Sequence, residues 1–274
     1  MTACTPGDGN DPERQYTRSD LSEHTEAYVR FQEDAALLLR FTAFFGELVT
    51  HSDEVGRILH EGREEPGEGG ETDKGAVYYM REHVAPMLRR LLFEKGVDNF
   101  LSYISDVLGL IFETRPQALR SSETVKLNEI LQHESMEQLI DFLVERKVER
   151  LAYQSLRDLG HDLETTLNFA LFLDEDAFTT AASAVEIRNV LVHNRGKVNR
   201  KYFRNVTDTT YELGDAIEVS GDHLFSTLGS LETSAHDIDL RAIEKFGLPA
   251  VTFRMRSVSF ATAQAKLTLG AASG

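Results

Sequence analysis

The chain has 274 residues, enough for one large domain or two small ones with a buried core. Its 45 acidic and 29 basic residues give a formal net charge of -16, which disfavours broad contact with nucleic acid or anionic membranes, so any phosphate contact has to be local. The single cysteine, Cys4, excludes an intrachain disulfide and zinc sites built from several thiolates, and no apolar stretch approaches the length of a membrane span. We therefore expect a soluble, cytoplasmic protein with no membrane partner.

The N-terminal part of the chain predicts a tail, a long helix and a loop. Residues 1–21 mix Gly, Pro, Asp, Thr and Arg without periodicity and bury too little apolar surface to offset the entropy of ordering, which favours a disordered tail. From Ser22 to about His60, apolar residues recur at spacings of three and four, the pattern of an amphipathic helix. Residues 61–73 are rich in Gly and Glu, which favours an exposed, mobile loop.

Helical patterning resumes at about Ala76 and continues to a stop before Pro116. Pro86 and Gly96 are unfavourable inside a helix, so we expect breaks near both residues. Asp98 is then a suitable N-cap for the helix that follows the second break.

A further helix is expected to begin at Ser135, because Gln138 follows three residues later as in a capping box. Its apolar residues continue to Leu156, and we expect the helix to end near Gly160. A shorter helical piece is expected over residues 163–172.

The C-terminal part predicts less regular structure before a last helix. Residues 198–210 have a helical pattern, and the two apolar segments of 211–219 flank Gly214-Asp215 like a small β-hairpin. A last helix is expected over 222–246. Residues 247–274 form a tail in which Val251, Phe253 and Met255 alternate with polar residues, a pattern that suits either a short strand or a mobile segment.

The clearest chemistry lies at the end of a helix that Asp174 is expected to cap and that runs to about Asn194. Its last turns read Arg188-Asn189-Val190-Leu191-Val192-His193. A guanidinium can stabilise charge on phosphate oxygens, and an imidazole exchanges protons near neutral pH, so this pair suits phosphodiester chemistry without a metal or cofactor. On one ideal helix, however, Arg188 and His193 point about 140° apart, so the Arg188 stem has to swing round or two chains have to contribute.

The surroundings of this segment are basic although the chain is acidic. Between Glu186 and Arg204 the formal charge is +5 inside a chain of -16, which marks the place for a phosphate backbone. Tyr202 and Phe203 lie in the same run, where exposed rings could stack on a base. The expected RNA-binding residues are Arg195, Lys197, Arg200, Lys201, Arg204 and Tyr202.

The segment Glu186-Ile-Arg-Asn-Val-Leu-Val-His193, with its continuation to Asn199-Arg200, resembles the RNxxxH motif of the HEPN family of prokaryotic defence and toxin proteins. Further patterns at Arg115-Pro116 with Ser121-Ser122, at 144–147 and at 213–215 extend the resemblance over residues 25–246. The residue patterns predict an all-α fold, a bundle with long helices, a small β-hairpin insertion and a domain over 22–246, and the resemblance implies that this bundle is of HEPN type. It also implies a homodimer whose two motif copies form one site.

The resemblance implies a metal-independent endoribonuclease in prokaryotic defence or a toxin system. The ribose 2′-hydroxyl would attack the adjacent phosphate and leave a cyclic phosphate. Arg188 would stabilise the charge, His193 would move the proton, and Asn189 would orient His193 or the substrate. RNA is the implied partner, together with a second copy of the chain and a cognate antitoxin or other defence-system protein.

Structural interpretations stand beside the functional ones. Arg188 could form a buried ion pair with an acid of a neighbouring helix, His193 could cap the helix end, and Asn189 could fix helix register. The basic run could be a solvated face, and Glu186 is expected at the surface or as a partner of Arg188 across the dimer. The alternative function is a noncatalytic dimeric module that binds RNA or protein.

Overall fold

The computed structural model describes residues 21–51, 80–119, 125–152, 154–206, 211–254 and 260. These residues are mainly helical and include one small two-stranded sheet, which agrees with the predicted all-α class. Apart from Leu21, the predicted tail lies outside the described residues, as does the predicted loop 61–73. Within the described part of the chain, no helix is both long enough and apolar enough to cross a membrane.

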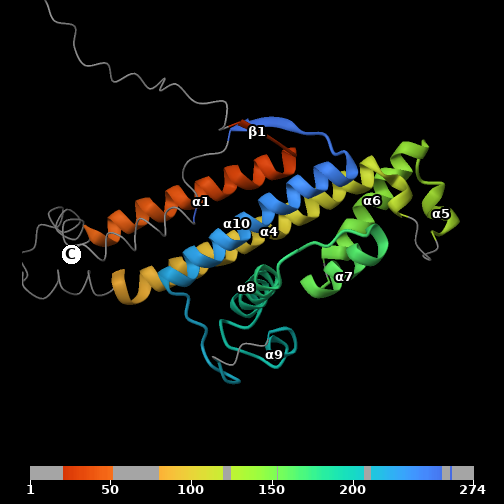
Figure 1. The fold of residues 1–274 in the computed structure, drawn as a ribbon. Coiled ribbons are helices and arrows are strands. Elements are labelled where there is room, and N and C mark those ends of the chain that lie inside the picture. The colour runs from red at the N-terminus through yellow and green to blue at the C-terminus, as the bar shows by residue number, and fades with distance from the viewer. Residues whose placement is uncertain are drawn as a thin grey trace, which may run out of the picture.

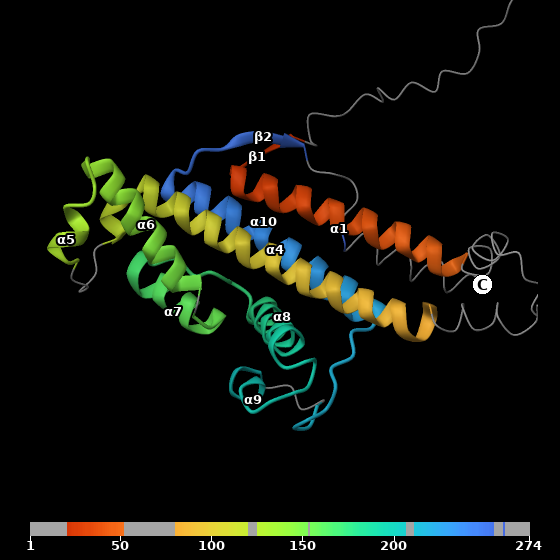
Figure 2. The same cartoon turned by 180° about the vertical axis from the view of Figure 1, so that it is seen from behind.

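Three long helices form the body of the molecule: α1 (Glu26–Thr50), α4 (Ala85–Thr114) and α10 (Gly221–Phe246). They lie side by side, and α1 runs opposite to α4 and α10 (Figures 1 and 2). Each buried large apolar side chain between them contributes about 1.5–3 kcal/mol of transfer free energy. The largest of these side chains are Tyr28, Phe93, Phe100, Tyr103, Ile111, Phe112 and Leu224.

Helix α4 is continuous, so the predicted break at Gly96 and the predicted N-cap at Asp98 are wrong. A five-residue π-helical turn, η2 (Met80–Val84), precedes α4, and Pro86 lies in its first turn, where a missing N–H costs no hydrogen bond. Gly96 is buried against α10, and a Cβ atom there would lie 2.5 Å from Cδ2 of Leu228. Gly96 therefore allows two helices to pack closely and does not end one.

The sheet joins the two ends of the described chain. Strand β1 (Leu21–His24) pairs antiparallel with β2 (Val251–Arg254), and Leu21 lies opposite Arg254. The segment 21–24 therefore forms a strand and not the predicted start of a helix. Helix α1 begins after Thr25, whose hydroxyl accepts a hydrogen bond from the Tyr28 N–H at 3.1 Å. The short strand suggested by the alternation at Val251 and Phe253 is present.

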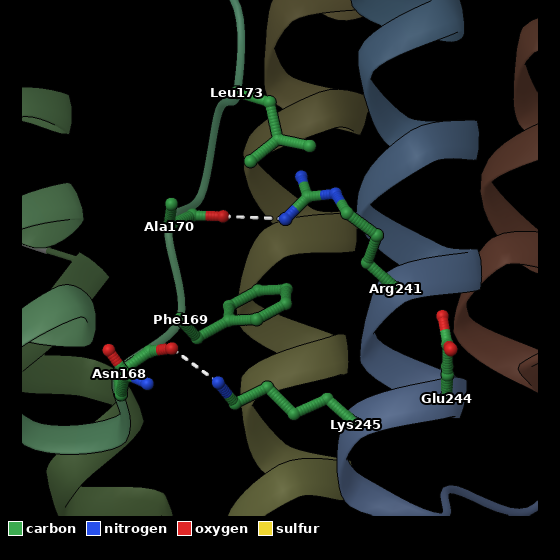
Figure 3. Close-up of a pocket in the computed structure, with 7 residues that line it drawn as sticks. All are labelled: Asn168, Phe169, Ala170, Leu173, Arg241, Glu244 and Lys245. Carbon is green, nitrogen blue, oxygen red and sulfur yellow. Dashed lines mark hydrogen bonds between the residues drawn. The ribbon is translucent and has the colours of Figure 1, made fainter.

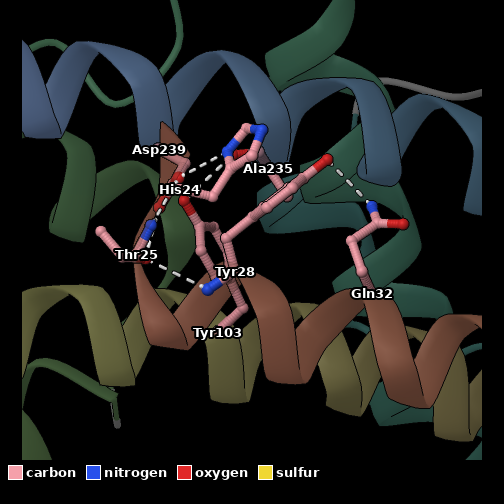
Figure 4. A network of polar contacts seen from close by, with 7 residues as sticks. All are labelled: His24, Thr25, Tyr28, Gln32, Tyr103, Ala235 and Asp239. Atoms are coloured by element: carbon pink, nitrogen blue, oxygen red, sulfur yellow. Dashed lines mark hydrogen bonds and ion pairs between the residues drawn. The ribbon is translucent and has the colours of Figure 1, made fainter. Parts of the chain in front are cut away.

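A buried polar network ties β1 to α10 (Figure 4). Asp239 is fully buried; its carboxylate contacts His24 Nδ1 at 2.9 Å and accepts hydrogen bonds from the Thr25 hydroxyl at 2.5 Å and the Thr25 N–H at 3.2 Å. From α4, the Tyr103 hydroxyl donates to the Ala235 carbonyl at 3.0 Å. Because a buried carboxylate needs such partners, the network specifies where the N-terminal strand docks.

Short helices cover one end of α4: η3 (Pro116–Leu119), α5 (Leu127–Ile130), α6 (Met136–Ala152) and α7 (Leu156–Leu167) (Figure 1). The predicted start of α6 is confirmed, since Ser135 Oγ accepts the Gln138 N–H at 3.2 Å. The helix ends at Ala152 and not near Gly160, because Ser155 caps a new helix, α7, by accepting the Asp158 N–H at 3.2 Å.

Helix α8 (Glu175–His193) is seen nearly end-on while α4 and α10 run across the view, so α8 crosses both (Figures 1 and 2). Its predicted N-cap is confirmed, since Asp174 accepts the Ala177 N–H at 3.1 Å. Of the predicted helix 198–210, only α9 (Tyr202–Asn205) is helical within the described residues. The predicted hairpin over 211–219 is absent: the described residues there contain a single bridge, between Lys197 and Ala216.

Candidate functional site

Helix α8 carries the motif to the first half of α4. Its buried face contains Ala181, Ala184, Ile187, Val190 and Leu191. Two of these residues are alanines, which lets α8 approach α4 and α10 closely. The last turns of α8, which hold Arg188, Asn189 and His193, therefore lie beside α4.

Arg188 makes an ion pair with α4. Its Nη2 lies 2.7 Å from Oδ1 of Asp98, and its Nη1 donates to Oδ1 of Asn189 at 3.2 Å. The two paired side chains are 23% and 37% exposed, so the pair is partly buried. The buried Nε–H of Arg188 has no hydrogen-bond partner among the described residues. The ion pair with a neighbouring helix, which the sequence left as an alternative, is thus present, and Arg188 retains an unused donor.

A second carboxyl group faces the same guanidinium. Burial and then the negative charge of Asp98 raise the pKa of Glu94, while Arg188 and Arg90 act in the opposite direction. Glu94 and Asp98 are four residues apart on α4 and share one face of the helix. Two carboxyl groups of α4, those of Asp98 and Glu94, therefore interact with the positive charge of Arg188.

His193 and Asn189 differ in their surroundings. His193 is the last residue of α8, is exposed, and makes no side-chain hydrogen bond within the described part of the chain, so the capping interpretation gains no support. Asn189 is half-buried and holds Arg188. Since Arg188 turns toward α4 while His193 faces solvent, a single α8 does not bring the two side chains together, as the helical geometry predicts. Glu186, expected at the surface, is only 5% exposed.

The cations of the basic run after α8 are exposed, whereas its tyrosine is buried. Tyr202 is 0% exposed, and its ring meets the rings of Phe203 and Tyr211 edge-on at 5.6 and 6.2 Å. The expectation that Tyr202 stacks on RNA is therefore wrong for this conformation, because α9 turns the ring into the core. Phe203 is 40% exposed. The exposed cations are Arg195, Lys197, Arg200, Lys201 and Arg204.

A groove lies between the first turns of α4 and the end of α8. From α4 and η2 it is lined by Glu82, His83, Pro86, Met87, Arg90, Leu91 and Glu94, and from the end of α8 by Leu191, Arg195 and Gly196. Sequence reasoning missed Arg90, Glu94 and the pairing role of Asp98. The three recur at a spacing of four, a signal that the predicted break at Gly96 hid by dividing one helical face in two.

Another hollow lies between α10 and the segment before α8, where side chains of α10 bind the main chain of that segment (Figure 3). Arg241 donates to the carbonyl oxygens of Ala170 and Leu171 at 2.6 and 2.9 Å, and its Nε donates to Asp237 at 2.8 Å. Lys245 donates to the Asn168 carbonyl. Both cations bind main-chain carbonyl groups and so hold the segment before α8 against α10.

Comparison with known family models, with curated proteins and with solved structures yields no match. Among the described residues, no three His, Cys, Asp or Glu side chains are grouped so that they could hold a metal ion.

Proposed function

We propose that this protein is a metal-independent endoribonuclease of HEPN type that acts in prokaryotic defence or as a toxin. The observation that carries the proposal is the end of α8, where the hydrogen-bonded Arg188–Asn189 pair and an exposed His193 are followed directly by exposed cations. An imidazole in solvent can exchange protons, and each Nη of a guanidinium carries two N–H donors, so Arg188 has Nη donors for a phosphate oxygen beyond those that Asp98 and Asn189 use. This combination serves chemistry at a phosphodiester.

In the proposed reaction the ribose 2′-hydroxyl attacks the adjacent phosphorus, and the bond from phosphorus to the 5′-oxygen breaks. The products are a 2′,3′-cyclic phosphate and a 5′-hydroxyl end. His193 moves the proton between these oxygens, Arg188 stabilises the negative charge on the phosphoryl oxygens, and Asn189 orients Arg188.

The proposed site is completed by a second copy of the chain, since one α8 directs Arg188 and His193 apart. Apolar side chains are also exposed on α8 and α9: Val192 is 44% and Phe203 40% exposed. Burying such side chains between two copies would stabilise a dimer through the hydrophobic effect.

A cognate antitoxin is the proposed partner if the protein is a toxin, and relief of growth inhibition by His193→Ala would support that role.

The first prediction is that the wild-type protein cleaves mixed single-stranded RNA in the presence of a chelator. We expect fragments with cyclic phosphate ends, detected by mass spectrometry, and a loss of rate of at least about a hundredfold in His193→Ala, the scale of general acid–base catalysis. Wild-type protein that leaves the RNA as intact as His193→Ala does would refute the proposal. Circular dichroism serves as the folding control.

The Arg188–Asp98 ion pair favours a second candidate, a noncatalytic dimeric module that binds RNA or a protein. In that case Arg188 holds α8 on α4, and Arg188→Ala lowers the melting temperature or disrupts the dimer. Arg188→Lys distinguishes a catalytic Arg188: this variant keeps the dimer and loses cleavage, because a lysine cannot bind a phosphate in the same two-pronged way.

A further inference from the structure

The groove between α4 and the end of α8 presents one arginine from each helix. A Cβ atom on Gly196 would lie 3.7 Å from Nη1 of Arg90, so the Arg90 guanidinium lies against the Gly196 backbone. Arg195 precedes Gly196 and lines the same groove. Neither guanidinium makes an ion pair or a hydrogen bond with any residue that the structure describes. Two arginines with free donors in one groove suit an anion.

The backbone at Arg195 is strained. Its φ is +54°, in the left-handed region that residues with a Cβ rarely adopt, and Gly196 follows with φ +75°. A glycine would fit position 195 better, yet the chain places a long cation there. Backbone strain of this kind gathers at functional sites, where the side chain is needed in one place.

The rest of the groove suits a nucleotide better than a bare anion. Met87 and Leu91 offer exposed apolar surface beside Arg90, against which a base or ribose can pack. Glu82 also lines the groove, from η2, the turn that precedes α4. Burial and the charge of Asp98 raise the pKa of Glu94, which also lines the groove, while the charges of Arg188 and Arg90 lower it.

We propose that this groove is a subsite for one nucleotide of single-stranded RNA, with its phosphate between Arg90 and Arg195 and its base or ribose on Met87 and Leu91. The inference rests on the proposed function, since the RNA strand leads from the groove past Leu191 to Arg188. Leu191 lines the groove and lies three residues after Arg188 on α8, so the two residues share one side of the helix. Arg90 is the residue that this subsite adds to the motif.

The test measures binding of a fluorescent oligouridylate of about 12 nucleotides by anisotropy, in the uncleaving His193→Ala background. We expect Arg90→Ala and Arg195→Gly each to raise the Kd about tenfold. Each variant should also reduce the slope of log Kd against log salt concentration by about 0.7 for each lost phosphate contact. Glycine accepts the positive φ, so Arg195→Gly removes the cation while it keeps the turn.

The matched control is Lys95→Ala, which removes an exposed cation from α4 outside the groove and should leave the Kd within about twofold. The subsite is overturned if both arginine variants bind like Lys95→Ala or if the His193→Ala protein binds no RNA. Cleavage by the wild type is scored separately. If RNA binding depends on Arg90 but the wild type cleaves no RNA, the subsite is supported and the ribonuclease is refuted. If the wild type cleaves RNA but both arginine variants bind as tightly as before, the ribonuclease is supported and the subsite is refuted.

Discussion

At the scale of single residues, the site is defined by how Arg188 is held. Its guanidinium touches Asp98 and Asn189 and keeps one buried N–H unused. The neighbouring Glu94 adds a second carboxyl group, so the positive charge that the motif would offer to a phosphate is partly balanced within the chain. A phosphate has to compete with Asp98 or use the remaining donors of Arg188.

Asp98→Asn should lower the free energy of unfolding by about 1 kcal/mol, because a partly buried guanidinium loses its charged partner. Urea denaturation measures this change. The matched control is Asp106→Asn on the same helix, which removes a more exposed pair with Arg30 and should cost less than about 0.5 kcal/mol. Equal losses in the two variants would show that burial does not strengthen the Arg188 pair.

At the scale of elements, the continuity of α4 decides the geometry of the site. One uninterrupted helix carries Arg90, Glu94 and Asp98 on a single face, four residues apart. The same helix carries Gly96, against which Leu228 of α10 packs. The same part of α4 therefore has two roles. Gly96 allows α10 to approach closely, and Asp98 is the acidic partner of Arg188.

Gly96→Ala should destabilise the protein by about 1–2 kcal/mol, since the new methyl group collides with buried Leu228 and the better helix propensity of alanine offsets only part of that cost. Gly109→Ala is the matched control on α4: nothing lies within 4 Å of its Cβ position, so the change should stabilise by up to about 1 kcal/mol. Thermal melting of both variants gives the sign, and a stabilising Gly96→Ala would contradict the packing argument.

At the scale of the whole molecule, the β1–β2 sheet closes the described chain over a buried cluster of titratable groups. His24 and His236 lie with ring centroids 5.1 Å apart, and both have a buried ring nitrogen without a partner among the described residues. Burial and the neighbouring His24 lower the pKa of His236, while Asp239 and Asp237 oppose the shift. The buried surroundings of His236, beneath the β1–β2 sheet, therefore favour its neutral form.

Stability should consequently fall in mild acid. A histidine whose folded pKa is lowered binds fewer protons in the folded state, so its contribution is present above the unfolded pKa of about 6.5 and is lost as the pH falls below it. Urea unfolding at about pH 7.5 and 5.5 should show a larger loss for the wild type than for His236→Gln, which cannot titrate. An equal loss in the two proteins would place the acid sensitivity elsewhere.

The sequence by itself determined the features that depend on local pattern. The helical class, the caps at Asp174 and Ser135 and the position of Arg188 to His193 at a helix end all follow from periodicity and capping chemistry within a few residues. The exposure of the cations after Gly196 was likewise expected from their charge.

Only the tertiary structure decided the features that depend on contacts between distant segments. Packing against Leu228 keeps Gly96 inside a helix, pairing with residues 251–254 turns 21–24 into a strand, and the core takes in Tyr202. The same holds for the site: Asp98 reads locally as a cap, and only the crossing of α8 over α4 makes it the partner of Arg188. The physical reason is that local propensities of about 1 kcal/mol yield to burial and ion pairing across the fold.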